Sequence, residues 1–280
     1  MHIGCNNMKV RKAVFPVGGL GTRFHPITRA IPKEMLGIID KPLIHYAFEE
    51  ALEGGIEQFI FVTRQGKNSI EDYFDGMLAE FETKTGAPKC SFCYVRQREP
   101  RGLGHAVLCA RHLVNDEPFA VICADDFILH SKSCIGEMIR NYNSANMAAV
   151  MTVPHEDVYR YGILDIESER GPIVIAKSVD EKPAVEEAKS DLAIVGRYIL
   201  SPKIFEVLEK LKPGVKGEIQ LTDALLEMIP KVGLQGFKFE GTRFDCGSKS
   251  GLLAAILHMA NKDKKLSAIL KKFYKENANN

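Results

Sequence analysis

The sequence predicts an α/β protein whose central sheet is mixed but mostly parallel and is flanked by helices. Two features of the chain predict this class. In the first half, short apolar runs alternate with helix-like segments, which is typical of parallel strands joined by helices that cover both faces. Glycines and aspartates follow several of the apolar runs directly, and open sheets of this kind bind ligands at the carboxyl ends of their strands.

In the first half, strands are expected where apolar residues run together. Helices are expected where apolar residues recur at helical spacing or a capping residue opens the segment. The predicted strands are residues 13–17, 59–63, 91–97, 119–125 and 147–154. The predicted helices are residues 42–53, 68–81, 103–114 and 134–143.

The second half has longer strand-like segments and closes with amphipathic helices. Its predicted strands are residues 162–166, 173–181, 192–200 and 237–244. Its predicted helices are residues 202–211, 217–229, 250–261 and 267–276. No repeat or clear linker divides the chain, so we expect one domain over 1–280, with parts at 9–154, 155–248 and 249–280.

Composition excludes several classes of function. The net charge of +1 gives no global field for nucleic acid or a membrane surface, and the apolar runs are too short to span a bilayer. The N-terminus lacks the apolar core of a secretory signal, and Met8 is a second candidate start of translation. The odd number of cysteines, 7, suits a reducing cytoplasm. Cys90 and Cys93 form a single pair in a strand pattern, which is weak support for a metal site.

The stretch 13–33, AVFPVGGLGTRFHPITRAIPK, joins the first strand to a glycine-rich polar loop. Its backbone amides, hydroxyl, guanidinium and ammonium are the groups that a triphosphate requires. It is not a Walker A loop, because no Gly-Lys-Ser/Thr ends it. A nicotinamide dehydrogenase is excluded, because Phe24 stands where the third glycine of the dinucleotide fingerprint is needed. The candidate ligand-binding residues are Gly18, Gly19, Leu20, Gly21, Thr22, Arg23 and Lys33.

Aspartates end two predicted strands. Asp125 and Asp126 close the run FAVICADD, and Asp245 closes the last strand before a glycine. Mg²⁺ prefers one or two carboxylates together with phosphate oxygens, so the pattern favours a divalent-metal site. The alternative for Asp125 and Asp126 is a turn or helix cap.

Further candidates lie near other strand ends. Gln97 offers the acceptor and the donor that the imide edge of a base requires. His105 follows closely and is more typical of helix packing than of catalysis. Glu181 and Lys182 together supply a carboxylate for sugar hydroxyls and a cation for a phosphate, although a solvated surface pair is the alternative. Asp223 is equally explained as a first-turn helix charge.

The glycine loop resembles the signature of the sugar-nucleotidyltransferases, G-x-G-T-R-x-x-P-x-T-x-x-x-P-K. The matched residues are Gly19, Gly21, Thr22, Arg23, Pro26, Thr28, Pro32 and Lys33. The resemblance extends from about residue 12 to 253. Blocks at residues 31–36, 40–44, 102–107, 192–200 and 217–224 are most similar to bacterial members that use UTP and glucose 1-phosphate. Gly18 and Gly37 depart from the commoner residues of that group.

The resemblance implies a Rossmann-like nucleotidyltransferase fold with a nucleotide-binding half at 9–154, sugar-side β insertions in a sugar-binding half at 155–248, and C-terminal helices. It implies catalytic roles for Arg23, Lys33, Asp125 and Lys182, and a Mg²⁺ ion held by Asp125 and Asp245. It assigns the nucleotide to Gly18, Gly19, Leu20, Gly21, Thr22, Glu34, Gln97 and Gly102. It assigns the sugar phosphate to Asp126, Gly162, Glu181, Lys182 and Gly196.

The implied partners are the small-molecule substrates UTP and glucose 1-phosphate and further copies of the chain, as a homodimer or homotetramer in the cytoplasm. Neither nucleic acid nor a membrane is expected. Two alternatives stay open: a related enzyme with another base or sugar, such as a thymidylyltransferase, and a non-catalytic regulatory subunit. The complete charged set of Arg23, Lys33, Asp125, Lys182 and Asp245 disfavours the second, because a decayed site would not need it.

Overall fold

The computed structural model of the chain describes residues 9–85, 90–129, 131–214 and 217–277, with the backbone alone for 78–85. The candidate start Met8 lies outside the described residues. The strands of the main sheet are β1 (Lys12–Pro16), β4 (Gln58–Thr63), β5 (Ser91–Arg96), β6 (Phe119–Ile122), β8 (Asn146–Thr152), β9 (Gly162–Arg170), β10 (Ile173–Glu181), β11 (Leu192–Leu200) and β12 (Leu234–Lys238).

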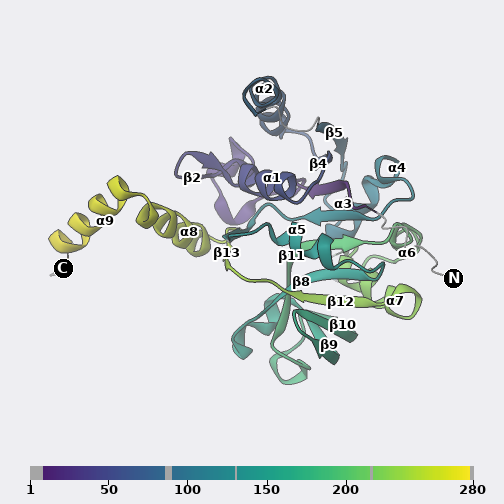
Figure 1. Cartoon of the computed structure of the whole chain (residues 1–280). Helices are drawn as coiled ribbons and strands as arrows, with labels where there is room; N and C mark the ends of the chain where they lie inside the picture. Colours follow the sequence, from purple (N-terminus) through teal and green to yellow (C-terminus); the bar gives the residue numbers. More distant parts are fainter. Residues whose placement is uncertain (1–8, 86–89, 130, 215–216, 278–280) are drawn as a thin grey trace.

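These strands form one mixed sheet in the order β5-β4-β1-β6-β11-β8-β12-β10-β9 (Figure 1). Strands β5, β4, β1 and β6 are parallel, and so are β8 and β12. Strand β11 is antiparallel to both of its main neighbours, and β12, β10 and β9 pair in antiparallel fashion. The predicted α/β fold with a mixed sheet is therefore confirmed. Parallel pairing is concentrated in the N-terminal half, and β11 joins the two halves into one sheet.

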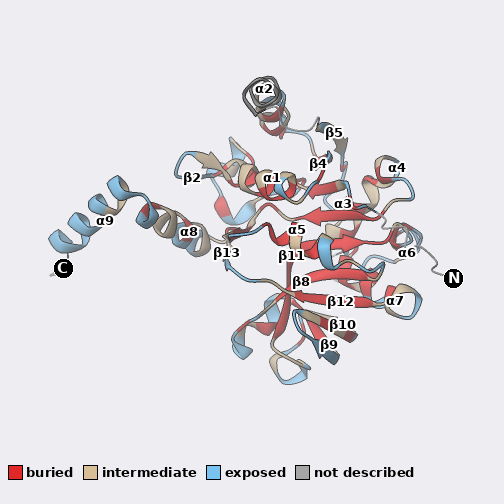
Figure 2. Cartoon of the chain, in the orientation of Figure 1, coloured by how far each residue is buried: buried red, intermediate tan, exposed pale blue. Residues whose placement is uncertain are grey.

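Helices cover both faces of the sheet because successive strand residues are apolar on both sides. Val14 and Val121 pack on one face, whereas Phe15 and Ile122 pack on the other, and the strands are accordingly buried (Figure 2). The first face is covered by α3 (Leu103–Cys109), α4 (Arg111–Val114), α6 (Ile204–Leu208) and α7 (Leu221–Val232). The second is covered by α1 (Leu43–Glu53), α2 (Asn68–Thr85) and α5 (Cys134–Asn141).

The predicted strand at 237–244 was wrong as a single element. Strand β12 ends at Lys238, and the chain turns at Gly241, whose φ of 138° is open to glycine alone. Strand β13 (Thr242–Asp245) then pairs with β7 (Asp126–Leu129) outside the main sheet. A small hairpin of β2 (Gly37–Ile38) and β3 (Lys41–Pro42) was not predicted either.

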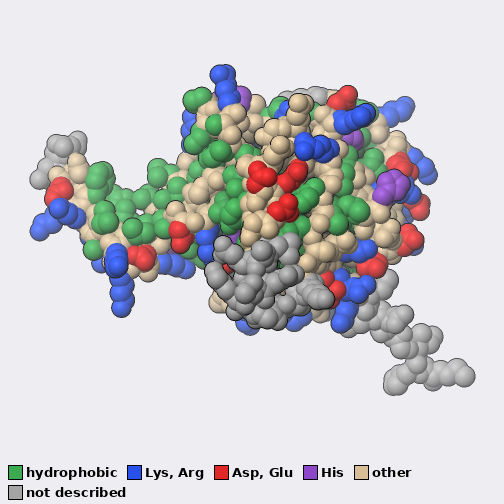
Figure 3. Space-filling view, turned by 90° about the horizontal axis from the view of Figure 1, so that it is seen from above, with side chains coloured by type: hydrophobic (Ala, Val, Ile, Leu, Met, Phe, Trp, Pro, Cys, Tyr) green, Lys and Arg blue, Asp and Glu red, His purple; other side chains and the backbone are tan. Residues whose placement is uncertain are grey.

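The two closing helices were predicted and form an arm that projects from the sheet (Figure 1). They are α8 (Lys249–Lys262) and α9 (Lys264–Asn277). Residues of α9 are mostly exposed (Figure 2), and hydrophobic side chains gather along the arm (Figure 3). Among the described residues, no helix is long and apolar enough to cross a membrane.

Candidate active site

A cleft of about 600 Å³ opens at the carboxyl ends of β1 and β6 and continues toward β9 and β10. It brings most of the predicted site residues together from distant parts of the chain. The predicted residues in its lining are Gly18, Gly19, Leu20, Gly21, Thr22, Arg23, Lys33, Gln97, Gly102, Asp125, Gly162, Glu181 and Lys182. Glu34, Asp126, Gly196 and Asp245 lie outside that lining.

The signature loop is held in shape by a glycine with positive φ and by a hydroxyl that hydrogen-bonds within the loop. Gly21 has a φ of 65°, and a Cβ there would lie 3.1 Å from Thr28 Cγ2. The Thr28 hydroxyl donates to the Gly21 carbonyl at 2.7 Å. This bond folds the loop back on itself and leaves Thr22 and Arg23 exposed at the cleft. The Arg23 guanidinium donates to the Gly247 carbonyl at 3.3 Å, which links the loop to the segment after β13.

Lys33 and Asp125 form an ion pair at the floor of the cleft. Burial by itself would lower the pKa of Lys33, but the carboxylates of Asp125 and Glu34 together more than offset that effect and raise the pKa. Burial likewise opposes ionisation of Asp125, yet the Lys33 ammonium holds the pKa of that carboxyl below its usual range. Both groups are therefore charged at neutral pH. The ammonium lies beside the backbone of Gly19, where a Cβ would be 3.9 Å from Lys33 Nζ.

Asp125 and Asp245 face the same point in space. A Cβ on Gly247 would lie 3.1 Å from Asp125 Oδ2 and 3.0 Å from Asp245 Oδ1, so only a glycine leaves the space between the carboxylates open. Arg160 donates to Asp245 Oδ2 at 3.0 Å. Among the described residues, no three His, Cys, Asp or Glu side chains gather as metal ligands. Two carboxylates with room for phosphate oxygens and water nevertheless suit Mg²⁺, which rarely has an all-protein cage.

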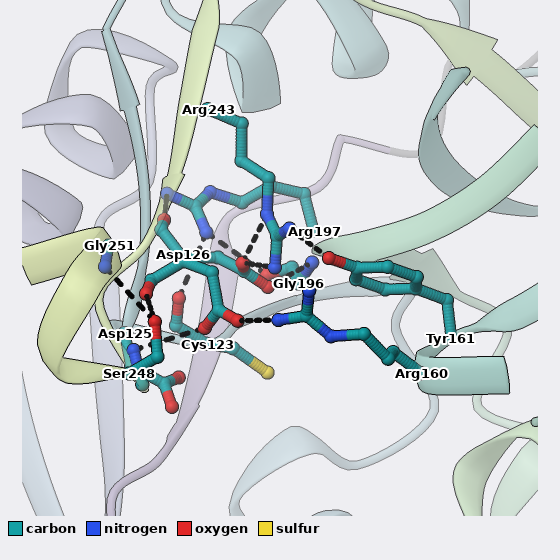
Figure 4. A network of polar contacts seen from close by, with 12 residues as sticks. Cys123, Asp125, Asp126, Arg160, Tyr161, Gly196, Arg197, Arg243, Ser248 and Gly251 are labelled. Atoms are coloured by element: carbon teal, nitrogen blue, oxygen red, sulfur yellow. Dashed lines mark hydrogen bonds and ion pairs between the residues drawn. The ribbon is translucent and has the colours of Figure 1, made fainter. Parts of the chain in front are cut away.

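Asp126 lies beneath the cleft in a polar network (Figure 4). Its Oδ2 accepts from the Gly196 amide at 2.8 Å, and its Oδ1 forms an ion pair with Arg243. Arg243 also donates to the Tyr161 hydroxyl at 3.0 Å. A Cβ on Gly196 would lie 2.6 Å from Asp126 Oδ2, so glycine allows this contact. The structure thus places Asp126 and Gly196 as supports of the cleft, and their predicted contact with the sugar phosphate stays a prediction.

A buried ion pair fixes the turn that carries Asp125. Arg197 of β11 and Glu50 of α1 have side-chain exposures of 1% and 5% and meet at 2.8 Å. The Arg197 guanidinium also donates to the carbonyls of Cys123 at 3.0 Å and Asp126 at 2.9 Å. Because these carbonyls flank Asp125, the guanidinium holds the acidic turn from below. Each of its donors is satisfied, as a buried charge requires.

The part of the cleft that is predicted to contact the base is built from two neighbouring segments. Gln97 Nε2 donates to the Gly102 carbonyl at 3.2 Å and lies 2.9 Å from His105 Nδ1. The Gly104 amide donates to the Ile219 carbonyl at 2.9 Å. A Cβ on Gly102, whose φ is 92°, would lie 2.7 Å from that same oxygen. Close approach of Glu218 and Ile219 therefore explains this glycine, and residues 218–220 form no helix, although a helix from residue 217 was predicted.

The part of the cleft that is predicted to contact the sugar phosphate is built from side chains. Glu181 Oε1 accepts from Lys182 Nζ at 2.6 Å, and Glu181 Oε2 accepts from the Thr222 hydroxyl at 2.7 Å. The Lys182 side chain is 53% exposed, so its charge can reach a ligand. A Cβ on Gly162 would meet Thr222 Oγ1 at 3.3 Å. Gly162, Glu181 and Thr222 thus form one corner of the cleft.

Glu34 lies behind the cleft and is 1% exposed. Its Oε2 accepts from Lys67 Nζ at 2.7 Å, which makes Glu34 the partner of a buried cation. Its predicted contact with the nucleotide stays a prediction. Sequence reasoning missed Lys67 and also several cleft residues, because their partners lie far away in the chain. Arg160 is one of the missed cleft residues, whereas Glu218, Gln220 and Thr222 belong to the 217–224 block that the resemblance had already singled out.

The chain resembles known proteins along nearly all its length. A family model described as nucleotidyl transferase matches residues 12–262. A UTP–glucose-1-phosphate uridylyltransferase of Pseudomonas aeruginosa is 45% identical over 264 residues, covering 88% of this chain and 94% of the relative. The enzyme of that name from Bacillus subtilis is 43% identical over 273 residues, covering 92% and 94%.

Solved structures agree with this similarity. A UDP-glucose pyrophosphorylase complexed with UDP-glucose has a TM-score of 0.85 and 42% identity, covering 91% of this chain and 100% of that one. A UTP-bound UGPase from Acinetobacter baumannii has a TM-score of 0.83 and 39% identity, covering 96% and 99%. The cleft, its signature loop and these similarities together place the chain in the nucleotidyl transferase family, among the UTP–glucose-1-phosphate uridylyltransferases.

Proposed function

We propose that the chain makes UDP-glucose and pyrophosphate from UTP and α-D-glucose 1-phosphate. One observation carries the proposal. The Lys33–Asp125 pair beside the signature loop and the Glu181–Lys182 pair line the same cleft. A cleft with two separate cations can bind two polyanions, whose mutual repulsion is the main obstacle to this reaction.

A phosphate oxygen of glucose 1-phosphate attacks the α-phosphorus of UTP in line. A new bond forms between this oxygen and the α-phosphorus while the bond from the α-phosphorus to the oxygen that bridges it to the β-phosphorus breaks. The electron pair of the broken bond leaves with pyrophosphate. The attacking phosphate is already ionised at neutral pH, so no general base is needed. Catalysis then rests on positioning and charge neutralisation.

The residues of the cleft have separate parts in this reaction. Arg23, Thr22 and the amides of Gly18–Gly21 hold the β- and γ-phosphates. Lys33 offsets charge that grows at the α-phosphate, and Lys182 holds the attacking phosphate. Gln97 and Gly102 contact the base, whereas Glu181 and Gly162 contact the sugar. Asp126, Glu34 and Gly196 support this arrangement from beneath.

Asp125 and Asp245 would hold a divalent cation, and Mg²⁺ is the ion that we propose. When bound, the cation neutralises charge on the phosphate oxygens. In the structure the carboxylates are paired with Lys33 and Arg160 instead. The Lys33 ammonium and the Arg160 guanidinium thus neutralise the charges of Asp125 and Asp245. Ligand oxygens would enter the open space beside Gly247.

We also propose that the chain acts as a homodimer or homotetramer in the cytoplasm, with residues 9–154 and 155–248 as its nucleotide and sugar halves. The large side chains Ile269, Phe273 and Tyr274 of α9 are exposed by 64%, 57% and 58%. A second copy that covered them would remove this apolar surface from water. Sedimentation velocity tests the assembly, and a monomer at micromolar concentration contradicts it.

The decisive experiment measures pyrophosphate release by the purified chain in the presence of Mg²⁺. Each of UTP, dTTP, ATP, CTP and GTP is paired in turn with glucose 1-phosphate, galactose 1-phosphate and N-acetylglucosamine 1-phosphate. Turnover with UTP and glucose 1-phosphate far above the other pairs is expected. A putative glucose-1-phosphate thymidylyltransferase from Bacillus anthracis is 25% identical with a TM-score of 0.73, so a thymidylyl activity is the second candidate. Preference for dTTP would favour it, and UTP binding without turnover would favour a regulatory subunit.

A further inference from the structure

The side-chain amide of Gln97 is held at both of its protons. Its Nε2 donates to the Gly102 carbonyl at 3.2 Å and lies 2.9 Å from His105 Nδ1. Because a carbonyl oxygen has no proton to donate, the end of the amide that faces Gly102 is the nitrogen and not the oxygen. An amide nitrogen carries two protons, and these two contacts use both of them. The donor end of Gln97 is therefore occupied within the protein.

The acceptor end of Gln97 faces the cleft. The residue is 4% exposed, and no residue in the described part of the chain donates a hydrogen bond to its Oε1. A Cβ on Gly18 would lie 2.7 Å from this oxygen, and Gly18 and Gln97 both line the cleft. An acceptor in so enclosed a position is stabilised by a ligand that brings a donor to it.

His105 is one of the two acceptors that fix this orientation. It lies in the first turn of α3 and, unlike Gln97 and Gly102, does not line the cleft. Burial and the nearby charge of Arg101 lower the pKa of His105, and the opposing charge of Glu99 has the smaller effect. The imidazole is therefore neutral at pH 7. With its proton on Nε2, it keeps a lone pair on Nδ1 that accepts from the amide.

The two contacts oppose a reversal of the amide. In the reversed orientation, Gln97 Oε1 would face the Gly102 carbonyl and His105 Nδ1, which are both acceptors. Two hydrogen bonds would be lost, and three acceptors would meet without a proton between them. A small displacement of the whole side chain, in contrast, keeps both bonds. The contacts thus select which end of the amide faces the cleft.

Pyrimidine bases differ at the atom that would meet this oxygen. Uracil and thymine carry a proton on N3 between two carbonyl groups, whereas N3 of cytosine is an unprotonated acceptor. An acceptor that faces the cleft binds the N3 proton of the first two and repels the lone pair of the third. The reversed amide would do the opposite. The orientation of one amide is therefore enough to favour the imide bases.

We propose that His105 is a positioning residue for base selection, which holds the Gln97 amide with its oxygen toward the cleft and so favours uracil and thymine over cytosine. The proposal rests on the proposed function, because it requires the base to lie beside Gln97 and Gly102. It gives His105 no contact with the substrate and no part in the chemical step. It does not separate uracil from thymine, because the two bases share the same imide.

Isothermal titration calorimetry of the full chain with Mg²⁺ tests the proposal, with UTP, dTTP and CTP as titrants and no sugar phosphate present. His105→Leu removes the acceptor, whereas His105→Asn keeps one, because the asparagine oxygen can take the place of Nδ1. His105→Leu should lower the ratio of UTP affinity to CTP affinity by about tenfold, the effect of one lost orienting hydrogen bond. His105→Asn should keep that ratio within about threefold of the original. The ratio of UTP affinity to dTTP affinity should change in neither variant.

The matched control is His112→Leu, a substitution of an exposed histidine in α4 that does not line the cleft. It should leave all three affinities unchanged. An unchanged ratio of UTP affinity to CTP affinity in His105→Leu would overturn the proposal. Equal weakening of all three nucleotides would also overturn it, because a general disturbance of α3 would then be the cause. So would a loss of selectivity in His105→Asn as large as that in His105→Leu.

Binding without a sugar phosphate separates this outcome from that of the proposed function. If the unmodified chain released no pyrophosphate but its selectivity for UTP depended on His105, the reaction alone would be contradicted. A preference for dTTP would change the substrate and leave the selection of imide bases intact. Normal formation of UDP-glucose with selectivity that does not depend on His105 would overturn the role of His105 and leave the reaction intact.

Discussion

The two sides of the cleft differ in how much of their arrangement exists before a substrate binds. On the nucleotide side, parallel strands end in glycine turns, and the paired Lys33 and Asp125 have side-chain exposures of 21% and 28%. On the sugar side, antiparallel strands present Glu181 and Lys182, and the latter is 53% exposed. Both Lys33 and Lys182 are paired with a carboxylate, but the Lys33 pair is the less exposed of the two and its position is therefore the more strongly fixed. Preorganised charge is the more effective in catalysis.

The largest expected effect is on the free energy of unfolding, at the buried Arg197–Glu50 ion pair beneath the cleft. Arg197→Met leaves Glu50 buried without its partner and should lower the free energy of unfolding by about 3–5 kcal/mol. Urea unfolding measures this loss. The double variant Arg197→Met/Glu50→Leu should recover much of it, because no charge is then left unpaired. A single variant within about 1 kcal/mol of the original would show that the pair is not needed for stability.

The next effect is at the centre of the nucleotide side. Lys33→Ala removes a preorganised cation and should lower turnover by about 10²–10³-fold, or about 3–4 kcal/mol in the transition state. Steady-state kinetics with saturating UTP and glucose 1-phosphate measures it. Lys177→Ala, an exposed lysine of β10, is the control and should change nothing. A fall of less than about tenfold, about 1.4 kcal/mol, would contradict the role given to Lys33.

A smaller effect is expected on the sugar side. Lys182→Ala should raise the KM for glucose 1-phosphate by about tenfold, because it removes one charge-assisted contact in a partly exposed position. The KM for UTP should stay nearly constant, and Lys182→Arg should retain part of the affinity. An equal rise in the KM for UTP and for glucose 1-phosphate would contradict the proposal that Lys182 contacts only the sugar phosphate.

The smallest effect concerns Gly18. A Cβ there would lie 2.7 Å from Gln97 Oε1, the end of a flexible side chain that can shift. Gly18→Ala should therefore change the KM for UTP by only about threefold, about 0.7 kcal/mol. Competition between UTP and dTTP measures whether base preference moves with it. A loss of about a hundredfold would instead mean that Gln97 is rigidly fixed.

The sequence predicted the local parts of this molecule better than the distant pairings. The apolar runs predicted most of the strands, and the signature loop predicted one wall of the cleft, because each is encoded by neighbouring residues. Strand 237–244 failed because Gly241 redirects the chain to β7. Helix 103–114 is interrupted at Ala110, and α7 starts four residues after the predicted position because Ile219 pairs with Arg101 and Gly104.

The supports of the site could not be predicted from local pattern. Arg197 and Glu50 are 147 positions apart, and Arg243 and Asp126 are 117 apart. Nothing near either arginine in the sequence identifies its partner. Lys67 stands in an ordinary connection after β4, and only the fold brings it to Glu34. Long-range ion pairs of this kind require the fold to be known first.

The segment before α7 links two parts of the cleft. The Ile219 carbonyl accepts from the Gly104 amide of α3, and the Thr222 hydroxyl, three positions later, donates to Glu181. Because only this short length of backbone separates the two contacts, a displacement of residues 219–222 would disturb the surroundings of Gly104 and of Glu181 together.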